Sequence, residues 1–207
     1  MIVLGVTGPS GSGKSFVSQA FRAKGTPLLD ADAVYHSLID RETPCTRALA
    51  EVFGNEILSV AGGVDRRRLA AMVFCGGERE KERLALLNKI THPFVLEGCY
   101  LWLEEQRCAG ADAVVLDAPL LIESGLHQKC DHVIAVLAPK ALRTSRIMER
   151  DGLTMAAAES RIAAQKDDEF YRNHADFLFV NDGDSAEAEG FVASLLSQLS
   201  ISPKNKF

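Results

Sequence analysis

The stretch IVLGVTGPSGSGKS, residues 2–15, decides the fold class. Its first six residues, 2–7, form a short apolar run bounded by glycine, which is typical of a buried parallel strand. Residues 8–15 fit the pattern G-x-x-x-x-G-K-[ST], and apolar residues recur at helical spacing after it. A glycine-rich turn between a strand and a helix is the context that a phosphate-binding loop requires.

The residue types of this loop suit the phosphate chain of a nucleotide. Glycines let consecutive main-chain N–H groups turn inward around phosphate oxygens, and the following helix points its partial positive charge at the same anion. Lys14 is expected to reach the β- and γ-phosphates, and the Ser15 hydroxyl is expected to ligate Mg²⁺. The alternative is a glycine-rich turn that matches the pattern by chance. The predicted nucleotide-binding residues are Gly8, Gly11, Ser12, Gly13, Lys14, Ser15 and Phe16.

Composition and charge exclude several classes of protein. Of 207 residues, 47% are hydrophobic and 25% are charged, so the chain is neither disordered nor fibrous. The formal net charge of −5 argues against phosphate-backbone binding as the main role, and we expect no nucleic-acid partner. An odd number of cysteines without a C-x-x-C pair favours reduced thiols over disulfides or a zinc ribbon.

The start of the chain carries no basic leader, and no apolar stretch is long enough to span a membrane. We therefore expect a soluble, cytoplasmic protein without a membrane partner.

Strands and helices alternate along the chain. Short apolar runs predict strands over residues 2–7, 27–30, 113–117, 132–137 and 177–180. Helical periodicity follows the loop and covers 33–39, 45–53, 65–74, 78–105, 139–150, 154–169 and 185–199. This alternation predicts an α/β fold with a five-stranded parallel sheet flanked by helices.

The stretch from residue 33 to residue 105 is too long for an ordinary crossover between two strands. We therefore expect a helical insertion over 33–105 and a nucleotide-binding core formed by 1–32 and 106–207. Pro93 lies inside the pattern of 78–105, where it should start a new helix or kink the existing one.

The loop predicts nucleotide binding but does not choose between a small-molecule kinase, a GTPase switch and an ATPase module. A GTPase should show N-K-x-D for guanine, and the nearest string, residues 88–91, lacks the aspartate. The size of the chain and the arginine-rich segment after the fourth strand fit a kinase better.

Two carboxylates, Asp30 and Asp32, follow the second predicted strand. Ligands of an open parallel sheet bind at the carboxyl ends of its strands, so these side chains are expected near the transferring phosphate. A carboxylate there can accept the proton of an acceptor hydroxyl. The alternative is that either residue only caps the next helix.

Several further stretches, together with the loop, resemble the dephospho-CoA kinase family. They are LLDAD (28–32), THP (91–93), VVLDAPLLIESGL (114–126), RIMERDGLT (146–154), Gln165 and HADFLFVNDGD (174–184). The resemblance implies transfer of the γ-phosphate of ATP to the ribose 3′-hydroxyl of 3′-dephospho-CoA, the last step of coenzyme A synthesis. It also implies a P-loop kinase core, a helical substrate-binding domain and a helical lid at about 139–169. ATP is then a co-substrate used with Mg²⁺, without a tightly bound cofactor, and we expect a monomer or weak oligomer.

The resemblance also implies roles for individual residues. Asp32 resembles the general base, which acts with Lys14, while Asp30 orients that site. Asp117 resembles the Walker B carboxylate that holds Mg²⁺ through water, although it could instead be a strand-end cap. The expected substrate-side residues are Asp30, His92, Pro93, Pro119 and Leu120. A structural role remains the alternative for His92, and Glu123 either orients neighbouring groups or is solvated.

The arginines of the expected lid are Arg143, Arg146 and Arg150. Helical spacing places them on neighbouring positions, where closure would bring their guanidinium groups onto the phosphates. A solvated arginine face is the alternative. The basic run 66–68 either faces the pyrophosphate of the substrate or is plain surface. Pro9 and Ser10 depart from the usual family loop at variable positions, and residues 35–36 replace an arginine that the family often carries.

Overall fold

A computed structural model of the chain describes residues 1–74, 76–183 and 185–201. Cys45, Cys99, Cys108 and Cys130 are free thiols, as expected, and Cys75 lies outside the described residues. No helix among the described residues combines the length and apolar character that crossing a membrane would need.

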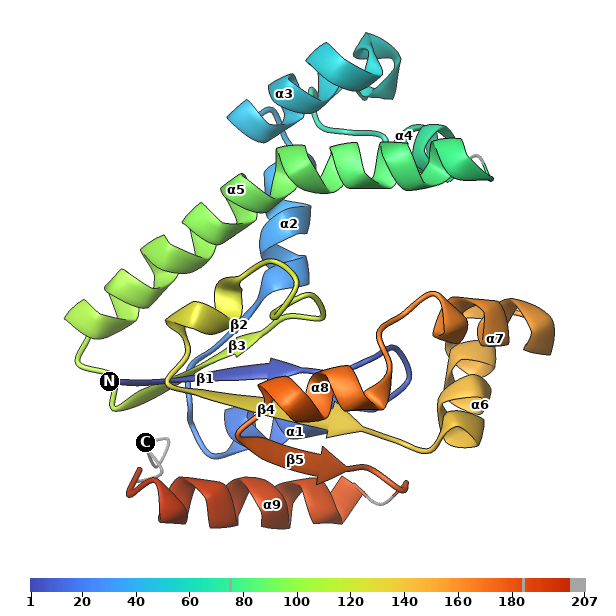
Figure 1. The fold of residues 1–207 in the computed structure, drawn as a ribbon. Helices are drawn as coiled ribbons and strands as arrows, with labels where there is room; N and C mark the ends of the chain where they lie inside the picture. The colour runs from blue at the N-terminus through green and yellow to red at the C-terminus, as the bar shows by residue number, and fades with distance from the viewer. Residues whose placement is uncertain (75, 184, 202–207) are drawn as a thin grey trace. The chain divides into compact units, whose positions relative to one another are not determined.

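The predicted parallel sheet is confirmed. Its strands are β1 (Ile2–Thr7), β2 (Leu28–Asp30), β3 (Ala113–Asp117), β4 (His132–Leu137) and β5 (Phe177–Val180). They lie side by side in the order β2-β3-β1-β4-β5, which places β1 at the centre of the sheet (Figure 1). The central position explains the apolar run of β1, because both of its faces are covered by other elements.

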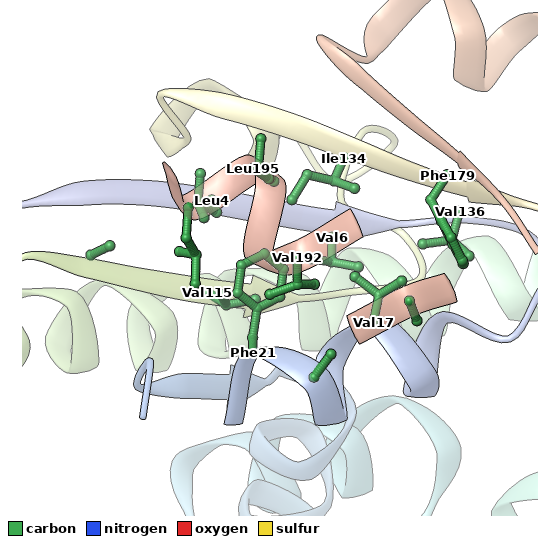
Figure 2. Packing of buried hydrophobic residues seen from close by; sticks show 14 of the residues in the cluster. Leu4, Val6, Val17, Phe21, Val115, Ile134, Val136, Phe179, Val192 and Leu195 are labelled. Carbon is green, nitrogen blue, oxygen red and sulfur yellow. The ribbon is translucent and has the colours of Figure 1, made fainter. Parts of the chain in front are cut away.

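Alternate side chains of the strands serve two different apolar clusters. On one face, Leu4 and Val6 of β1 pack with Val17 and Phe21, and Figure 2 shows Val192 in the same cluster. On the other face, alternate residues of β4 pack against Ile122 and Tyr171. The sheet is thereby fixed between helical layers, and the loop after β1 starts from a rigid strand end.

The helices are α1 (Lys14–Ala23), α2 (Ala31–Ile39), α3 (Pro44–Phe53), α4 (Arg66–Val73), α5 (Glu78–Cys108), α6 (Lys140–Asp151), α7 (Met155–Ala163), α8 (Asp168–His174) and α9 (Ser185–Gln198). Two short 3₁₀ turns, η1 (Asn55–Ile57) and η2 (Leu126–Lys129), were not expected from the sequence.

The prediction of one helix over residues 154–169 is wrong. Helix α7 ends at Ala163, and α8 begins at Asp168. The side chain of Asp167 accepts a hydrogen bond from the main-chain N–H of Phe170, which starts a new helix at this point. An N-cap aspartate inside a periodic pattern was therefore the missed signal.

Pro93 lies inside α5 and does not start a new helix. The ribbon of α5 changes direction along its length (Figure 1). A proline inside a helix removes one main-chain hydrogen bond and crowds the preceding turn, which accounts for a bend without a break.

The chain divides into two compact units, one formed by residues 1–29 with 105–207 and the other by residues 30–104. We call them the core unit and the helical unit. The sheet belongs to the core unit except for the last residue of β2. The helical unit has its own apolar cluster, which includes Ile39, Leu49, Ile57 and Val73. The helical insertion expected from the sequence was residues 33–105.

Candidate active site

The loop between β1 and α1 has a main chain that only glycine can adopt at several positions. Gly11 and Gly13 have φ angles of 79° and 84°, in the left-handed region. A Cβ atom on Gly8 would lie 2.2 Å from the carbonyl oxygen of Val136, and one on Gly13 would lie 1.9 Å from Asn181 Nδ2. Alternation of left-handed glycines with ordinary residues forms an anion-binding concavity of N–H groups.

The N-terminus of α1 contributes a positive electrostatic potential to this concavity. No acidic residue occupies the first turn of α1, and its N-cap, Gly13, supplies no side chain to the helix N–H groups. Ser12 is only 1% exposed, and its Oγ has no hydrogen-bond partner among the described residues. A buried hydroxyl without a partner is uncommon and fits a loop shaped for a polar ligand.

Asp117, at the carboxyl end of β3, is bound to the first residues of α1. Lys14 Nζ forms an ion pair with Asp117 Oδ1, and Ser18 Oγ donates to Asp117 Oδ2 at 2.5 Å. The Asp117 carboxylate thus accepts from these side chains of α1. Ser18 lies four residues after Lys14, on the same face of the helix, so helical spacing could have identified it from the sequence.

The oxygen donors next to Lys14 suit Mg²⁺. Mg²⁺ in phosphate-transfer sites uses only one or two protein oxygens and takes the rest from phosphates and water. Ser15 and Asp117 supply a hydroxyl and a carboxylate. No group of three or more His, Cys, Asp or Glu side chains suited to a metal occurs in the described part of the chain. Ser15 and Asp117 are therefore the residues present that fit a nucleotide-bound Mg²⁺.

Arg143, on α6, is buried against the loop. Its Nε donates to the carbonyl oxygen of Ser10 at 3.1 Å, and its Nη2 donates to Gln165 Oε1 at 3.0 Å. Nη1 lies 3.6 Å from Asp168 Oδ1. The arginine is only 5% exposed, and burial lowers its pKa although Asp168 acts in the opposite direction. This guanidinium is therefore engaged by protein groups on several sides.

Arg146 contacts the next part of the loop. Its Nη1 donates to the carbonyl oxygens of Gly11 and Ser12, at 3.1 and 3.3 Å. Its Nη2 donates to Asn181 Oδ1 at 3.1 Å. Asn181, which follows β5, also donates from Nδ2 to the carbonyl oxygen of Ser12 at 3.0 Å. The loop is therefore held by both α6 and the end of β5.

Arg150 differs from the other two arginines because its side chain is 57% exposed. It donates through Nη2 to Ser10 Oγ at 3.2 Å and pairs with Asp151. The hydrogen bond with Asp151 raises the pKa of Arg150 and lowers the pKa of Asp151. Arg161 of α7 also pairs with Asp151 at 2.6 Å. The three predicted lid arginines thus all contact the loop, and Arg150 keeps the most freedom.

Other predicted residues of the core unit lie beside the loop. The carbonyl oxygen of Pro119 accepts a hydrogen bond from Thr7 Oγ1 at 3.2 Å, which fixes the segment after β3 to the end of β1. Leu120 is 44% exposed, and Phe16 is partly exposed. Apolar side chains open to solvent at the site leave contact area for an organic substrate.

Asp30 and Asp32, two of the predicted site residues, lie at the start of α2 in the helical unit. Asp30 is the N-cap of α2, and its Oδ1 accepts from the N–H groups of Asp32 and Ala33 at 2.9 and 3.4 Å. Capping was one of the two alternatives for Asp30, and it explains why α2 begins at Ala31 instead of residue 33. Asp32 lies in the first turn of α2. The expected roles of Asp30 and Asp32 toward a substrate stay predictions.

His92 and Pro93 lie on α5, and burial lowers the pKa of His92, which favours the neutral form of its imidazole. In the basic run, Arg66 forms an ion pair with Asp40 at 2.6 Å, and Arg68 pairs with Asp65 at 3.3 Å. Arg66 and Arg68 therefore stabilise the helical unit itself.

Sequence reasoning assigned no role to Gln165 or Asn181, although both lie in stretches that carried the resemblance. Gln165 Oε1 accepts a hydrogen bond from the N–H of Ser10 at 3.1 Å. Such contacts join residues more than a hundred positions apart, and local periodicity gives no signal for them.

The sheet order and the loop place the chain among the P-loop kinases, a class of phosphotransferases. A shikimate kinase of Acinetobacter baumannii has the same fold, with a TM-score of 0.54 and 14% identity over 97% of this chain and 93% of that chain. The family model for dephospho-CoA kinase matches residues 2–187, and the chain belongs to this family.

Individual relatives agree with the family model. A dephospho-CoA kinase of Corynebacterium glutamicum is 37% identical over 203 residues, which cover 96% of this chain and 100% of that protein. The solved structure of a dephospho-CoA kinase from Campylobacter jejuni has a TM-score of 0.68 and 26% identity, and covers 96% of each chain. The chain therefore matches these relatives over nearly their whole length.

Proposed function

We propose that this chain transfers the γ-phosphoryl group of ATP to the ribose 3′-hydroxyl of 3′-dephospho-CoA and yields coenzyme A and ADP. The family match over residues 2–187 supports the reaction class and the acceptor. The observation that carries the proposal within this chain is the loop itself. Its glycines already form an anion-binding concavity, and Lys14 stands at its end beside the carboxylate of Asp117.

The loop and Lys14 supply electrostatic stabilisation. Main-chain N–H groups and the Lys14 ammonium balance the charge that develops on the transferred phosphoryl group and on the departing ADP oxygen. The ion pair with Asp117 keeps the Lys14 ammonium next to the carboxylate that is proposed to hold Mg²⁺. Ser15 and Asp117 are the residues that would hold Mg²⁺, which supplies additional charge neutralisation when bound.

Asp32 is the proposed general base. Its carboxylate accepts the proton of the 3′-hydroxyl as the oxygen forms a bond to the γ-phosphorus. The bond between the γ-phosphorus and its bridging oxygen breaks, and the electron pair leaves with ADP. Asp30 positions this step indirectly, because its side chain caps the helix on which Asp32 lies.

Helices α6 and α7 are proposed to form the lid. Arg150 is the arginine with the most exposed side chain of the three and is the best placed to contact phosphates directly. Closure over the nucleotide would exclude water, which limits hydrolysis of ATP in the absence of an acceptor.

An ADP-release assay with a panel of acceptors tests the proposal. Wild-type protein with Mg²⁺ and ATP should release ADP rapidly with 3′-dephospho-CoA and slowly with AMP, CMP or adenosine. Preference for a nucleoside or a nucleoside monophosphate would assign the chain to another kinase reaction. Binding of ATP or GTP without transfer to any acceptor would indicate a nucleotide-dependent switch instead.

A further inference from the structure

Several side chains that the proposed reaction does not use are bonded to the main chain of the phosphate-binding loop. At Ser10, the carbonyl oxygen accepts from Arg143 Nε and the N–H donates to Gln165 Oε1, both at 3.1 Å. Gln165 Oε1 also accepts from Arg143 Nη2 at 3.0 Å. Arg143 and Gln165 therefore form a linked pair that holds both polar groups of one loop residue.

A second pair holds the loop two residues further on. Asn181 Nδ2 donates to the carbonyl oxygen of Ser12 at 3.0 Å, and Arg146 Nη1 donates to the same oxygen at 3.3 Å. Arg146 Nη2 and Asn181 Oδ1 are in turn hydrogen-bonded at 3.1 Å. Each pair consists of one arginine from α6 and one amide side chain from a later segment of the core unit.

The geometry of the peptide group links these contacts to phosphate binding. In a planar trans peptide the C=O and the following N–H point to opposite sides. A donor that holds the Ser10 carbonyl on one side turns the N–H of Gly11 to the other side, and the same holds for Ser12 and Gly13. Gly11 and Gly13 are the residues whose left-handed φ angles shape the concavity.

The N–H group of Ser12, which lies between these two glycines, donates within the loop itself. Ser12 N donates to the carbonyl oxygen of Pro9 at 3.1 Å, inside the loop. Side-chain contacts thus hold the two peptide groups whose N–H groups belong to Gly11 and Gly13. The peptide group between them is held by the loop's own hydrogen bond and by Arg146 Nη1, which donates to the carbonyl oxygen of Gly11 at 3.1 Å.

We propose that Gln165 and Asn181 are positioning residues, which hold the loop in its anion-binding form before a nucleotide arrives. They contact the loop main chain directly, at the N–H of Ser10 and the carbonyl oxygen of Ser12. They also hold Arg143 and Arg146, which become braces of the loop main chain in addition to any direct contact with phosphate. The proposal rests on the loop binding the phosphates of ATP, as proposed above. It adds that affinity for ATP depends on amide side chains that touch the outside of the loop.

Gln165 allows a sharp test because only its oxygen takes part in these bonds. Gln165→Met keeps the length of the side chain and removes that oxygen. Gln165→Glu keeps an oxygen acceptor at the same place for both Ser10 and Arg143. The matched control is Gln128→Met, at an exposed position of η2. All variants are full-length proteins.

Calorimetric titration with Mg-ATP should show the Kd of Gln165→Met raised about tenfold, because only a fraction of the molecules would hold the binding-competent loop. The Kd of Gln165→Glu and of Gln128→Met should stay within about twofold of wild type. In kinetics, the KM for ATP should rise with the Kd, while kcat and the KM for 3′-dephospho-CoA change by less than about threefold. If Gln165 only stabilised the fold, its loss would not raise the Kd and KM for ATP selectively, and glutamate would not restore them.

Asn181→Ala removes the second contact and should raise the Kd for ATP in the same direction. If Gln165→Met does not fold, which its melting temperature would reveal, Asn181→Ala still tests the proposal. The proposal is overturned if folded Gln165→Met or Asn181→Ala binds ATP as tightly as wild type, or if Gln165→Glu is as weak as Gln165→Met. If wild type binds ATP but forms no coenzyme A, the proposed function fails, and the binding comparison still tests the braces.

Discussion

Charged and polar side chains serve different ends in the two compact units. In the core unit, Arg143 and Arg146 bind main-chain atoms that lie 133 and 135 positions away in the sequence. In the helical unit, Arg68 pairs with a residue three positions away and Arg66 with one 26 positions away. Arg143 and Arg146 of the core unit hold the main chain of the phosphate-binding loop, whereas Arg66 and Arg68 stabilise the helical unit.

This contrast shows where function is most firmly determined. The phosphate-binding loop combines left-handed glycines with hydrogen bonds from residues distant in the sequence. This combination of features favours nucleotide binding over other functions. Helix caps and short-range ion pairs occur in many helical domains. The identity of the proposed acceptor therefore rests on the family match and not on the shape of the helical unit.

The largest effect is expected at the loop. Lys14→Ala should lower kcat/KM for ATP by roughly 10⁴-fold or more, because it removes a cation that stabilises both bound and transferring phosphate. Steady-state kinetics and ATP titration measure this loss. Lys89→Ala, at an exposed position of α5, is the control. If Lys14→Ala still bound ATP and turned it over, the assignment of residues 8–15 as the phosphate-binding loop would be wrong.

A change in the helical unit should instead affect turnover alone. Asp32→Asn should lower kcat by roughly 10²–10⁴-fold, since the amide cannot accept the hydroxyl proton, while the Kd for ATP stays near that of wild type. The exposed Asp112→Asn of the core unit is the control. A kcat for Asp32→Asn within tenfold of wild type would contradict the general-base role and weaken the division of labour between the units.

Two arginines of the same helix should separate stability from catalysis. Arg143→Ala should cost about 3 kcal/mol of unfolding free energy, because it leaves buried partners unpaired. Arg150→Ala should leave stability nearly unchanged and lower kcat by about tenfold, since its exposed guanidinium is freer to contact phosphate. Chemical denaturation and kinetics of both variants make the comparison. Equal losses of unfolding free energy in the two variants would show that the difference in side-chain exposure between Arg143 and Arg150 does not separate their roles.

The smallest effect is expected from the cap of α2. Asp30→Ala should cost about 1 kcal/mol of unfolding free energy, and Asp30→Asn should retain most of it, because asparagine also caps helices well. Urea denaturation measures both. A large loss of kcat in Asp30→Asn at unchanged stability would instead give its charge a direct role toward the substrate.

Much of the fold could be predicted from the sequence. The bounds of β1, β3, β4 and β5 agree with the predicted ones. Strands β1, β3 and β4 are buried on both faces and give continuous apolar runs, and β5 is a short apolar run at the edge of the sheet, where Leu178 and Val180 are partly exposed. The division of residues 154–169 was missed because periodicity continues through the gap and the capping role of Asp167 outweighs it. Pro93 was expected either to start a new helix or to kink the existing one, because a proline alone does not decide between a bend and a break, and it lies inside α5.

The candidate site could be predicted only in part. The loop motif follows from a local pattern, whereas the role of Asp117 was implied by the family resemblance. The partners of Arg143 and the contacts of Gln165 and Asn181 depend on how α6 and the segments after α7 and β5 meet the loop. No local pattern carries that information, so the contact of Arg143 with the Ser10 carbonyl could not be predicted, and its expected contact with phosphate stays a prediction.

Direct identification of the product tests the proposed reaction as a whole. Purified protein is incubated with Mg²⁺, ATP and 3′-dephospho-CoA, and the acceptor is recovered and analysed by mass spectrometry and ³¹P NMR. The account predicts one ADP for each acceptor converted, with the new phosphate on the ribose 3′-oxygen. Recovery of unchanged acceptor from a protein that binds ATP, or a phosphate at another position, would contradict it.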